Sequence, residues 1–423
     1  MSEPIGWISS RLRFVASIRN SNVDKKSYDG QRPVLLCNYT DVYYNETITS
    51  CHGLMEATAS QSEIEKFSLL AGDVIITKDS ETANDIGIPA WVPKSLPGVV
   101  CGYHLTQLRT NEMVTPEFLF RTLQATTTRQ YLEVQTPGVT RFGLDQNTIG
   151  SIPVLVPPKE LQSAITSYLE RETTRIDALV AKKTRFIELL REKRQALITQ
   201  AVTKGLDPSV PMKDSGVEWL GEVPAHWGVV RGGSVLVEQR AKNDPIRSDY
   251  YLSLMANIGI IPYAEKGDVG NKKPDDLTKC KMVSPGDFVI NSMNYAIGSY
   301  GVSSYAGVCS PVYVVMRHRP EEMDPRFMDL IFSNPSYQNY AQSFGTGILD
   351  HRRAIGWDEI KVIRVPLPPI DEQARIAAWS IKQRERVDLL IAKTERSIEL
   401  LREHRTALIT AAVTGKIDLR DAA

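Results

Sequence analysis

One seventeen-residue segment occurs twice in the chain with very little change. Residues 187–203 read IELLREKRQALITQAVT, and residues 398–414 read IELLREHRTALITAAVT. Only three positions differ, so 14 of 17 agree, and the offset is 398 − 187 = 211 residues. The similarity extends over residues 157–207 and 368–418. A repeat of this length and spacing implies an internally duplicated molecule, in which the region between the copies is duplicated too.

Each copy is predicted to form one long helix. A Pro-Pro pair precedes each copy, apolar residues recur at helical spacing, and Gly205 and Gly415 fall near the two ends. About 45 residues at 1.5 Å each give a rod of roughly 65–70 Å. A polar rod with a single apolar stripe is not stable alone, so we expect the two helices to pack on each other.

The repeated residues include exposed positions as well as the apolar stripe, such as Glu188 and Thr199. Two unrelated coiled-coil strands would share the stripe but not those positions. The duplicated exposed positions therefore suggest a duplicated surface for a partner. The candidates for partner docking or helix pairing are Ile187, Leu190, Arg191, Arg194, Leu197, Ile398, Leu401, Arg402, Arg405 and Leu408.

The regions before the two helices correspond only faintly. Trp7 aligns with Trp227, and the segment AGDVII at 71–76 aligns with PGDFVI at 285–290, each predicting a tight turn before a buried strand. Further strands are expected at 102–109 and 310–317, and helical stretches at 116–131 and 324–340. The rods have thus stayed alike while the globular parts have diverged. This contrast favours rods that serve a common partner and globular domains that each read something different.

Composition limits the cellular setting and the classes of function. There is no apolar run long enough for a membrane span and no signal peptide, and five scattered cysteines without CxxC spacing fit a reducing cytoplasm. Lysine plus arginine equals aspartate plus glutamate at 50 each. Since bulk charge gives no general attraction to nucleic acid, a nucleic-acid binder of this composition needs specific contacts or partners.

Over essentially its whole length the chain resembles the specificity subunit of type I restriction–modification systems. The resemblance rests on two PPxxxQ helix starts (Pro157, Pro158, Gln162 and Pro368, Pro369, Gln373) and on the two IELLRExRxALIT runs. It also rests on DSGVEWLGEVPAHW at 214–227 and GDVIITKDS at 72–80. One departure is Leu161, where many members carry glutamate, as Glu372 does in the second copy.

The resemblance implies an α+β fold: two similar mixed α/β target recognition domains, separated by two long antiparallel helices that form a coiled coil with pseudo-two-fold symmetry. The expected boundaries are 1–156 for the first domain, 157–205 for the first spacer helix, 206–215 for a linker, 216–367 for the second domain and 368–416 for the second spacer helix. Each domain would read half of a bipartite, asymmetric site in double-stranded DNA. Half-sites about one helical turn apart suit such a molecule.

The implied partners are two adenine methyltransferase subunits and, through them, restriction and translocase subunits. The chain itself would be non-catalytic and bind no cofactor or metal, with S-adenosylmethionine, ATP and magnesium on the partners. Two alternatives stay open. One is the recognition chain of a stand-alone methyltransferase or phage-defence complex without cleavage, and the other is a coiled-coil scaffold that does not bind DNA.

Candidate base-reading residues are polar side chains on the loops that follow buried strands, together with arginines in Gly-rich turns. Asparagine and lysine suit donor and acceptor groups on base edges, and arginine suits guanine or phosphate. In the first domain these are Asn38, Tyr39, Thr40, Lys78, Asp79, Ser80, Thr82 and Arg141. In the second they are Asn291, Ser292, Asn294, Tyr295, His351, Arg352 and Arg353.

Motifs for catalysis by this chain are weak. NPSY at 334–337 is similar to the Asn-Pro-Pro-Tyr loop that holds a flipped adenine in amino-methyltransferases. Serine replaces a proline there, and no alternating strand–helix pattern surrounds it for a nucleotide cofactor. A P-loop sequence is missing, and the six histidines show no paired ligand spacing. We therefore expect a DNA-recognition subunit rather than an enzyme.

Overall fold

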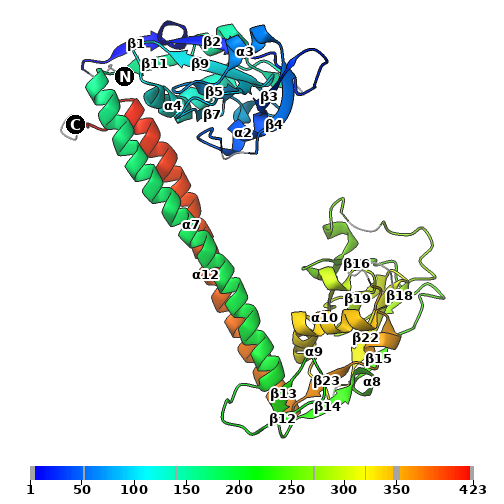
Figure 1. Ribbon diagram of the computed structural model, residues 1–423. Helices are drawn as coiled ribbons and strands as arrows, with labels where there is room; N and C mark the ends of the chain where they lie inside the picture. The colour runs from blue at the N-terminus through cyan, green and yellow to red at the C-terminus, as the bar shows by residue number, and fades with distance from the viewer. Residues whose placement is uncertain are drawn as a thin grey trace. The chain divides into compact units, whose positions relative to one another are not determined.

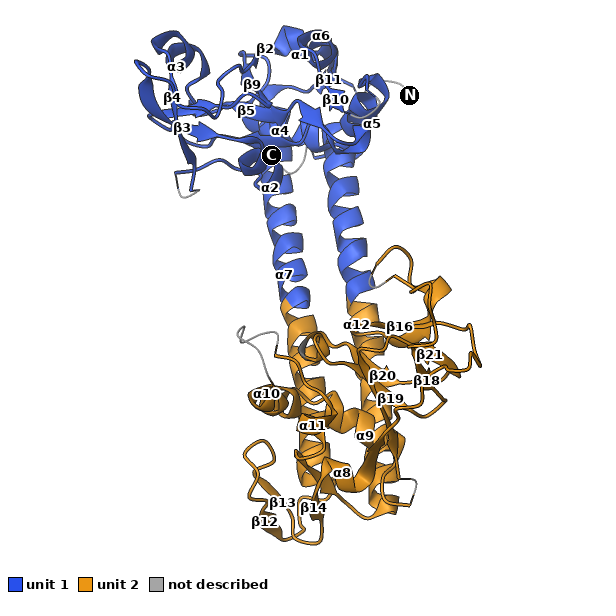
Figure 2. Ribbon diagram, turned by 90° about the vertical axis from the view of Figure 1, so that its right-hand side faces the viewer, with its two compact units in different colours: residues 1–184, 395–423 blue, residues 185–394 orange. Residues whose placement is uncertain are grey.

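The computed structural model describes residues 5–50, 53–138, 141–269, 272–319, 321–345 and 353–419. The chain divides into two compact units, coloured separately in Figure 2. Unit 1 comprises Met1–Thr184 and Glu395–Ala423, and unit 2 comprises Arg185–Thr394. Each unit combines one globular domain of mixed strands and helices with part of both long helices. The fold is α+β, as the sequence predicts.

Two long helices contain the repeated segment (Figure 1). Helix α7 spans Lys159–Lys204 and helix α12 spans Ile370–Val413, 46 and 44 residues. Each begins directly after a Pro-Pro pair and has acidic residues in its first turn, where the helix dipole favours negative charge. Each ends close to a glycine with positive φ, Gly205 at 77° and Gly415 at 68°. The predicted starts and stops are confirmed to within a few residues.

The long helices run antiparallel and use equivalent ion pairs in the two units. In unit 1, Arg405 of α12 pairs with Asp177 of α7 at 3.0 Å. In unit 2, Arg194 of α7 pairs with Asp388 of α12. The residues correspond through the repeat, because 388 − 177 = 211 and 405 − 194 = 211. Along α7 from 177 to 194 the partner position falls from 405 to 388, which defines the antiparallel direction.

The main sheets of the two globular domains share one strand order. In unit 1 the order is β2-β9-β5-β7, and in unit 2 it is β15-β22-β19-β20, all antiparallel. The unit 1 strands are β2 (Ala16–Asn20), β9 (Leu105–Thr110), β5 (Val74–Thr77) and β7 (Pro89–Trp91). The unit 2 strands are β15 (Leu236–Glu238), β22 (Tyr313–His318), β19 (Phe288–Asn291) and β20 (Tyr300–Val302). The faint correspondence of the globular sequences therefore reflects a shared scaffold.

A buried ion pair fixes the centre of each main sheet. Asp73 and Asp287 lie in the Gly-Asp turns that precede β5 and β19, and both are almost fully buried. Arg109 on β9 meets Asp73 at 2.7 Å, and Arg317 on β22 meets Asp287 at 2.7 Å. In each case both carboxylate oxygens accept from the guanidinium. A bidentate pair satisfies a carboxylate that would otherwise be costly to bury.

Strands at the edge of each domain connect it to its long helix. β1 (Ile8–Arg11) pairs with β11 (Pro153–Val156), and β14 (Gly228–Arg231) pairs with β23 (Arg364–Leu367). The strand that leads into each Pro-Pro pair thus lies beside the strand that follows Trp7 or Trp227. This confirms the alignment of the two tryptophan segments.

The remaining strands differ between the units. Unit 1 has a three-stranded sheet of β4 (Met55–Ala59), β3 (Arg32–Cys37) and β8 (Val99–Cys101), with β3 and β8 parallel. Unit 2 has two pairs instead, β16 (Leu252–Met255) with β17 (Gly259–Pro262) and β18 (Lys281–Val283) with β21 (Gly307–Cys309). A parallel bridge between Tyr251 and Val308 links the two pairs. The second sheet is therefore less continuous in unit 2 than in unit 1.

Each expected helical stretch of the globular domains is two shorter helices. Unit 1 has α4 (Pro116–Gln124) and α5 (Thr126–Gln135), and unit 2 has α9 (Pro325–Phe332) and α10 (Pro335–Phe344). In unit 2 the break lies where Pro335 begins α10 behind its N-cap Asn334. Proline is favoured at a helix start but cannot continue the preceding helix.

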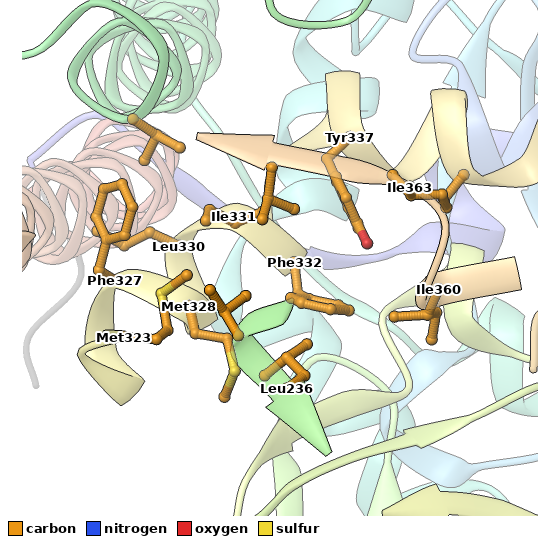
Figure 3. Packing of buried hydrophobic residues seen from close by; sticks show 14 of the residues in the cluster. Leu236, Met323, Phe327, Met328, Leu330, Ile331, Phe332, Tyr337, Ile360 and Ile363 are labelled. Carbon is orange, nitrogen blue, oxygen red and sulfur yellow. The ribbon is translucent and has the colours of Figure 1, made fainter. Parts of the chain in front are cut away.

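The C-terminal parts of the repeats lie in the globular cores. Ile198, Ala201 and Val202 of α7 are buried in the core of unit 2, and their counterparts Ile409, Ala412 and Val413 of α12 are buried in the core of unit 1. Figure 3 shows the core of unit 2, where Phe332 of α9 and Tyr337 of α10 lie among aliphatic side chains. Much of the repeated sequence is therefore explained by packing of each helix end on a domain.

Candidate nucleic-acid interface

The polar loops of unit 1 meet at a hollow of about 420 Å³. Four segments form it: helix α2 (Tyr39–Tyr44), the loop around β6 (Asp79–Ser80), the turn before β9 that carries His104, and the turn leading into β10 (Phe142–Gly143). β6 pairs with β10, which holds the second and fourth segments together. Six of the residues predicted from the sequence line the hollow: Tyr39, Thr40, Asp79, Ser80, Thr82 and Arg141.

The other two candidates of the first domain lie outside the hollow. Asn38 is the N-cap of α2, and its backbone N–H donates to the Asp41 carboxylate at 2.7 Å. Lys78 donates to the backbone oxygen of Ser21 at 3.1 Å, and its ammonium lies over the Tyr103 ring, 4.5 Å from the centroid. The Asn38 backbone and the Lys78 side chain thus have structural contacts, and a DNA contact for either residue remains a prediction.

Sequence reasoning predicted Tyr39 but missed Tyr43 and Tyr44, which also line this hollow. The rings of Tyr39 and Tyr43 stack with centroids 5.5 Å apart, and the Tyr43 hydroxyl donates to Asp85 at 2.6 Å. That hydrogen bond raises the pKa of Tyr43 to about 12. Tyr44 is 76% exposed. The spacing of Tyr39 and Tyr43, four residues apart on one helix face, was the available signal.

The charge of the hollow is dominated by carboxylates. Asp79, Glu81 and Asp85 line it, against Arg141 and His104. His104 Nδ1 lies 2.8 Å from Asp79 Oδ2, so these two side chains contact each other in the wall of the hollow. Carboxylates are poor ligands for phosphate but accept from the exocyclic amino group of cytosine, and arginine suits guanine or phosphate. This arrangement suits base edges better than the DNA backbone.

The candidate residues of the second domain follow β19. Asn291 is the last residue of that strand, and its side chain accepts from the backbone N–H of Met293 at 3.2 Å. Ser292 and Asn294 are half-buried, and Met293 between them is 53% exposed. Arg353 is half-buried, whereas His351 and Arg352 lie outside the described residues.

The structure corrects the expectation for Tyr295. Its side chain is only 1% exposed, and its hydroxyl donates to the backbone oxygen of Phe332 at 2.8 Å. Burial strongly raises the pKa of this phenol. Tyr295 is a core residue that joins β19's loop to α9, and it does not reach a base.

The candidates on the long helices fall into two groups. Ile187, Leu190 and Ile398 are buried, and Arg194 and Arg405 form the inter-helix ion pairs described above. Leu197, Leu401 and Leu408 are half-buried, and Arg191 and Arg402 are exposed. The first group stabilises the helix pair, and a partner contact for the exposed residues remains a prediction.

The glutamine of each PPxxxQ motif joins the long helix to its globular domain. Gln162 is fully buried; its amide donates to the backbone oxygens of Met113 and Pro157, both at 2.9 Å, and its oxygen accepts from the Thr115 N–H at 2.8 Å. Thr115 is the N-cap of α4. The motif therefore fixes the start of α7 against the start of α4.

The NPSY segment is a helix start within the core. The Asn334 side chain accepts from the Ser336 N–H at 2.9 Å, and Tyr337 is fully buried against Trp219 and Phe332. Neither side chain is presented to solvent as an adenine-binding loop requires.

Two features are missing from the described part of the chain. No helix there is both long and apolar enough to cross a membrane. No three His, Cys, Asp or Glu side chains in the same ranges gather as ligands of a metal ion would.

Comparisons with known proteins agree on one family. Residues 4–189 match the family model described as type I restriction modification DNA specificity domain. The chain is 23% identical over 370 residues to the putative type I restriction enzyme MjaX specificity subunit of Methanocaldococcus jannaschii, covering 85% of this chain and 82% of that protein. It is 20% identical over 367 residues to the MjaVIII specificity subunit of the same organism, covering 82% and 80%.

Solved structures share the fold. A chain from a structure that describes complex assembly and conformational transition of the type I R-M system matches with a TM-score of 0.71 at 18% identity, over 99% of this chain and 100% of that one. The HsdS subunit from Thermoanaerobacter tengcongensis matches with a TM-score of 0.56 at 19% identity, over 99% of each chain.

Proposed function

We propose that this chain is a type I restriction–modification specificity subunit, which reads a bipartite DNA site with its two globular domains and docks two methyltransferase subunits on its long helices. Each domain reads one half-site independently of the other. The catalytic steps, and with them S-adenosylmethionine, ATP and magnesium, belong to the methyltransferase and restriction subunits.

The observation that carries this proposal is a shared scaffold with unlike reading loops. Both units have the same main sheet, the same buried ion pair and the same glutamine contact to the long helix. Unit 1 presents tyrosines and carboxylates at its hollow, whereas the loop after β19 in unit 2 presents Ser292, Met293 and Asn294. Two such domains would read different sequences, which gives an asymmetric site.

Equivalent exposed leucines support two docking sites. Unit 1 exposes Leu179 of α7 and Leu400 of α12, by 39% and 48%. Unit 2 exposes their counterparts, Leu390 of α12 and Leu189 of α7, by 40% and 46%, since 390 − 179 = 211 and 400 − 189 = 211. Apolar side chains repeated at exposed positions are typical of a surface that a partner covers.

Reconstitution with the methyltransferase subunit encoded beside this chain tests the proposal. We expect native mass spectrometry to show two methyltransferase subunits per chain, and methylome sequencing to show adenine methylation at one bipartite motif. The chain alone should give no methylation. A complex that methylates without sequence preference, or that forms without this chain, would contradict the proposal.

A further inference from the structure

The junction between helix pair and globular domain differs between the two units. In unit 1 the Glu46 carboxylate, on the loop after α2, accepts from Arg405 of α12 at 2.6 Å. The same carboxylate accepts from Arg121 at 3.4 Å and from Gln124 at 2.8 Å, both on α4. Arg405 therefore holds two carboxylates, Glu46 of the domain and Asp177 of α7.

Unit 2 also has two arginines, Arg194 and Arg384, where unit 1 has Arg405 and Arg121. Arg194 is the counterpart of Arg405 and pairs with Asp388. The position of Arg121 on α4 is taken by Leu330 on α9, five residues after the first proline of each helix. The position of Thr173, which accepts from Arg121 at 3.3 Å, is taken by Arg384 on α12, because 384 − 173 = 211. Unit 2 therefore also has a second arginine, but this arginine lies on the long helix α12, whereas Arg121 of unit 1 lies on the short helix α4.

No carboxylate in the described part of unit 2 takes the place of Glu46. Arg194 and Arg384 instead line a hollow of about 810 Å³, to which residues of α7, α12, α9 and the strand β20 contribute. Its acidic residue Asp329 forms no ion pair within the described ranges; burial raises its pKa, and the charge of Arg384 opposes that rise. Arg326 in the same wall is held by Asp324 at 2.7 Å. Arg194 and Arg384 therefore have one carboxylate within ion-pair distance, Asp388, where Arg405 and Arg121 have two, Asp177 and Glu46.

The walls of this hollow suit a peptide better than a DNA backbone. Ile258 is 68% exposed and Ile381 is 39% exposed, and both line it. These isoleucines lie beside Arg384, which forms no ion pair within the described ranges, and beside Arg194, which pairs with Asp388 alone. Such a surface matches a segment that carries apolar and acidic side chains together. A phosphodiester would satisfy the arginines and leave the isoleucines in water.

We propose that an acidic side chain of the methyltransferase subunit docked on unit 2 enters this hollow and binds Arg194 and Arg384, as Glu46 binds Arg405 and Arg121 in unit 1. This inference rests on the proposed function, because it requires that methyltransferase subunits dock on the chain. Two identical methyltransferase subunits thus contact different surfaces on the two units, because in unit 1 Glu46 already occupies the junction and repels a second carboxylate. One of the two docking steps depends on Arg384, and the other does not.

The substitution Arg384→Thr tests this, because it introduces the residue that unit 1 has at the equivalent position. Arg386→Thr on the same helix is the matched control, since Arg386 is exposed and does not line the hollow. In titrations of the full chain with methyltransferase subunit, followed by native mass spectrometry, R384T should weaken one docking step about tenfold or more and leave the other unchanged. R386T should leave both steps unchanged. Equal affinities for R384T and wild type would overturn the inference.

A photo-crosslinking amino acid at Ser304 identifies the occupant directly. Ser304 is exposed and lines the hollow. In the complex with methyltransferase and target duplex, we expect a crosslink to a methyltransferase peptide that contains aspartate or glutamate. A crosslink to a DNA strand, or to neither macromolecule, would overturn the inference while leaving the proposed function intact. A wild-type chain that binds no methyltransferase would overturn both, and this is seen before any substitution is made.

Discussion

Gln373 on α12 repeats each hydrogen bond that Gln162 makes on α7. Its amide donates to the backbone oxygens of Glu322 at 2.8 Å and Pro368 at 2.9 Å, and its oxygen accepts from the Asp324 N–H at 2.9 Å. Asp324 is the N-cap of α9, as Thr115 is of α4. Two glutamines 211 residues apart thus fix the two long helices to their domains in the same way. This contact explains the glutamine of the PPxxxQ motif.

Substitution of Gln162 should destabilise unit 1. Gln162→Ala leaves a buried N–H and two buried carbonyl oxygens without their partner, at a cost of about 2–4 kcal/mol in unfolding free energy. Hydrogen exchange of the α4 amides should report the loss. Ser163→Ala, at the adjacent exposed position, is the control and should change little. Equal protection in both variants would mean that the glutamine contact does not hold α4.

Neighbouring leucines on α7 should separate helix pairing from partner docking. Leu190 is buried, so Leu190→Glu places a charge in the helix pair and should cost about 3 kcal/mol or more. Leu189 is 46% exposed, so Leu189→Glu should change stability by less than about 0.5 kcal/mol but lose one methyltransferase subunit. Thermal unfolding and native mass spectrometry measure the two effects. Full docking by L189E would exclude this leucine from the docking surface.

Tyr43 should ionise late in an alkaline titration. The hydrogen bond to Asp85 raises its pKa from an ordinary value near 10 to about 12. The raised pKa favours the protonated phenol in the folded state. Its stabilising effect is therefore present below about pH 10 and is lost as pH rises through about 12. Difference absorbance spectra of wild type and Tyr43→Phe should isolate one late-titrating tyrosine, and Asp85→Asn should return it towards pH 10. A normal titration in wild type would contradict the contact.

The sequence alone predicted the parts that depend on local or repeated patterns. The long helices, their ends and the Gly-Asp turns before β5 and β19 all follow from spacing, glycine and proline. The residues that it missed act across long separations. Glu46 meets Arg405, 359 positions away, and no local pattern marks such a pair. Tyr295 was misassigned because a polar residue after a strand can turn inward, and its hydroxyl finds a partner at Phe332.

An exchange of the first domain should change one half-site only. Residues 1–156 of a relative with a different specificity carry their own hollow and the backbone groups that Gln162 of α7 contacts, so the exchanged domain should fold on the same α7. Methylome sequencing of the hybrid should show one new half-site and one retained. A change in both halves would contradict independent reading.

We expect the two long helices to set the distance between the two independently read half-sites. Insertions near residues 199–202 would disturb the core of unit 2, where Ala201 and Val202 are buried, so the change belongs in the middle of both helices. Seven residues added after Lys182 in α7 and after Leu400 in α12 keep the apolar stripe nearly in phase and lengthen each helix by about 10 Å. DNA rises 3.4 Å per base pair, so the gap should grow by about three base pairs. Methylome sequencing should show both half-sites unchanged with this longer gap. An unaltered gap with full activity would contradict the account.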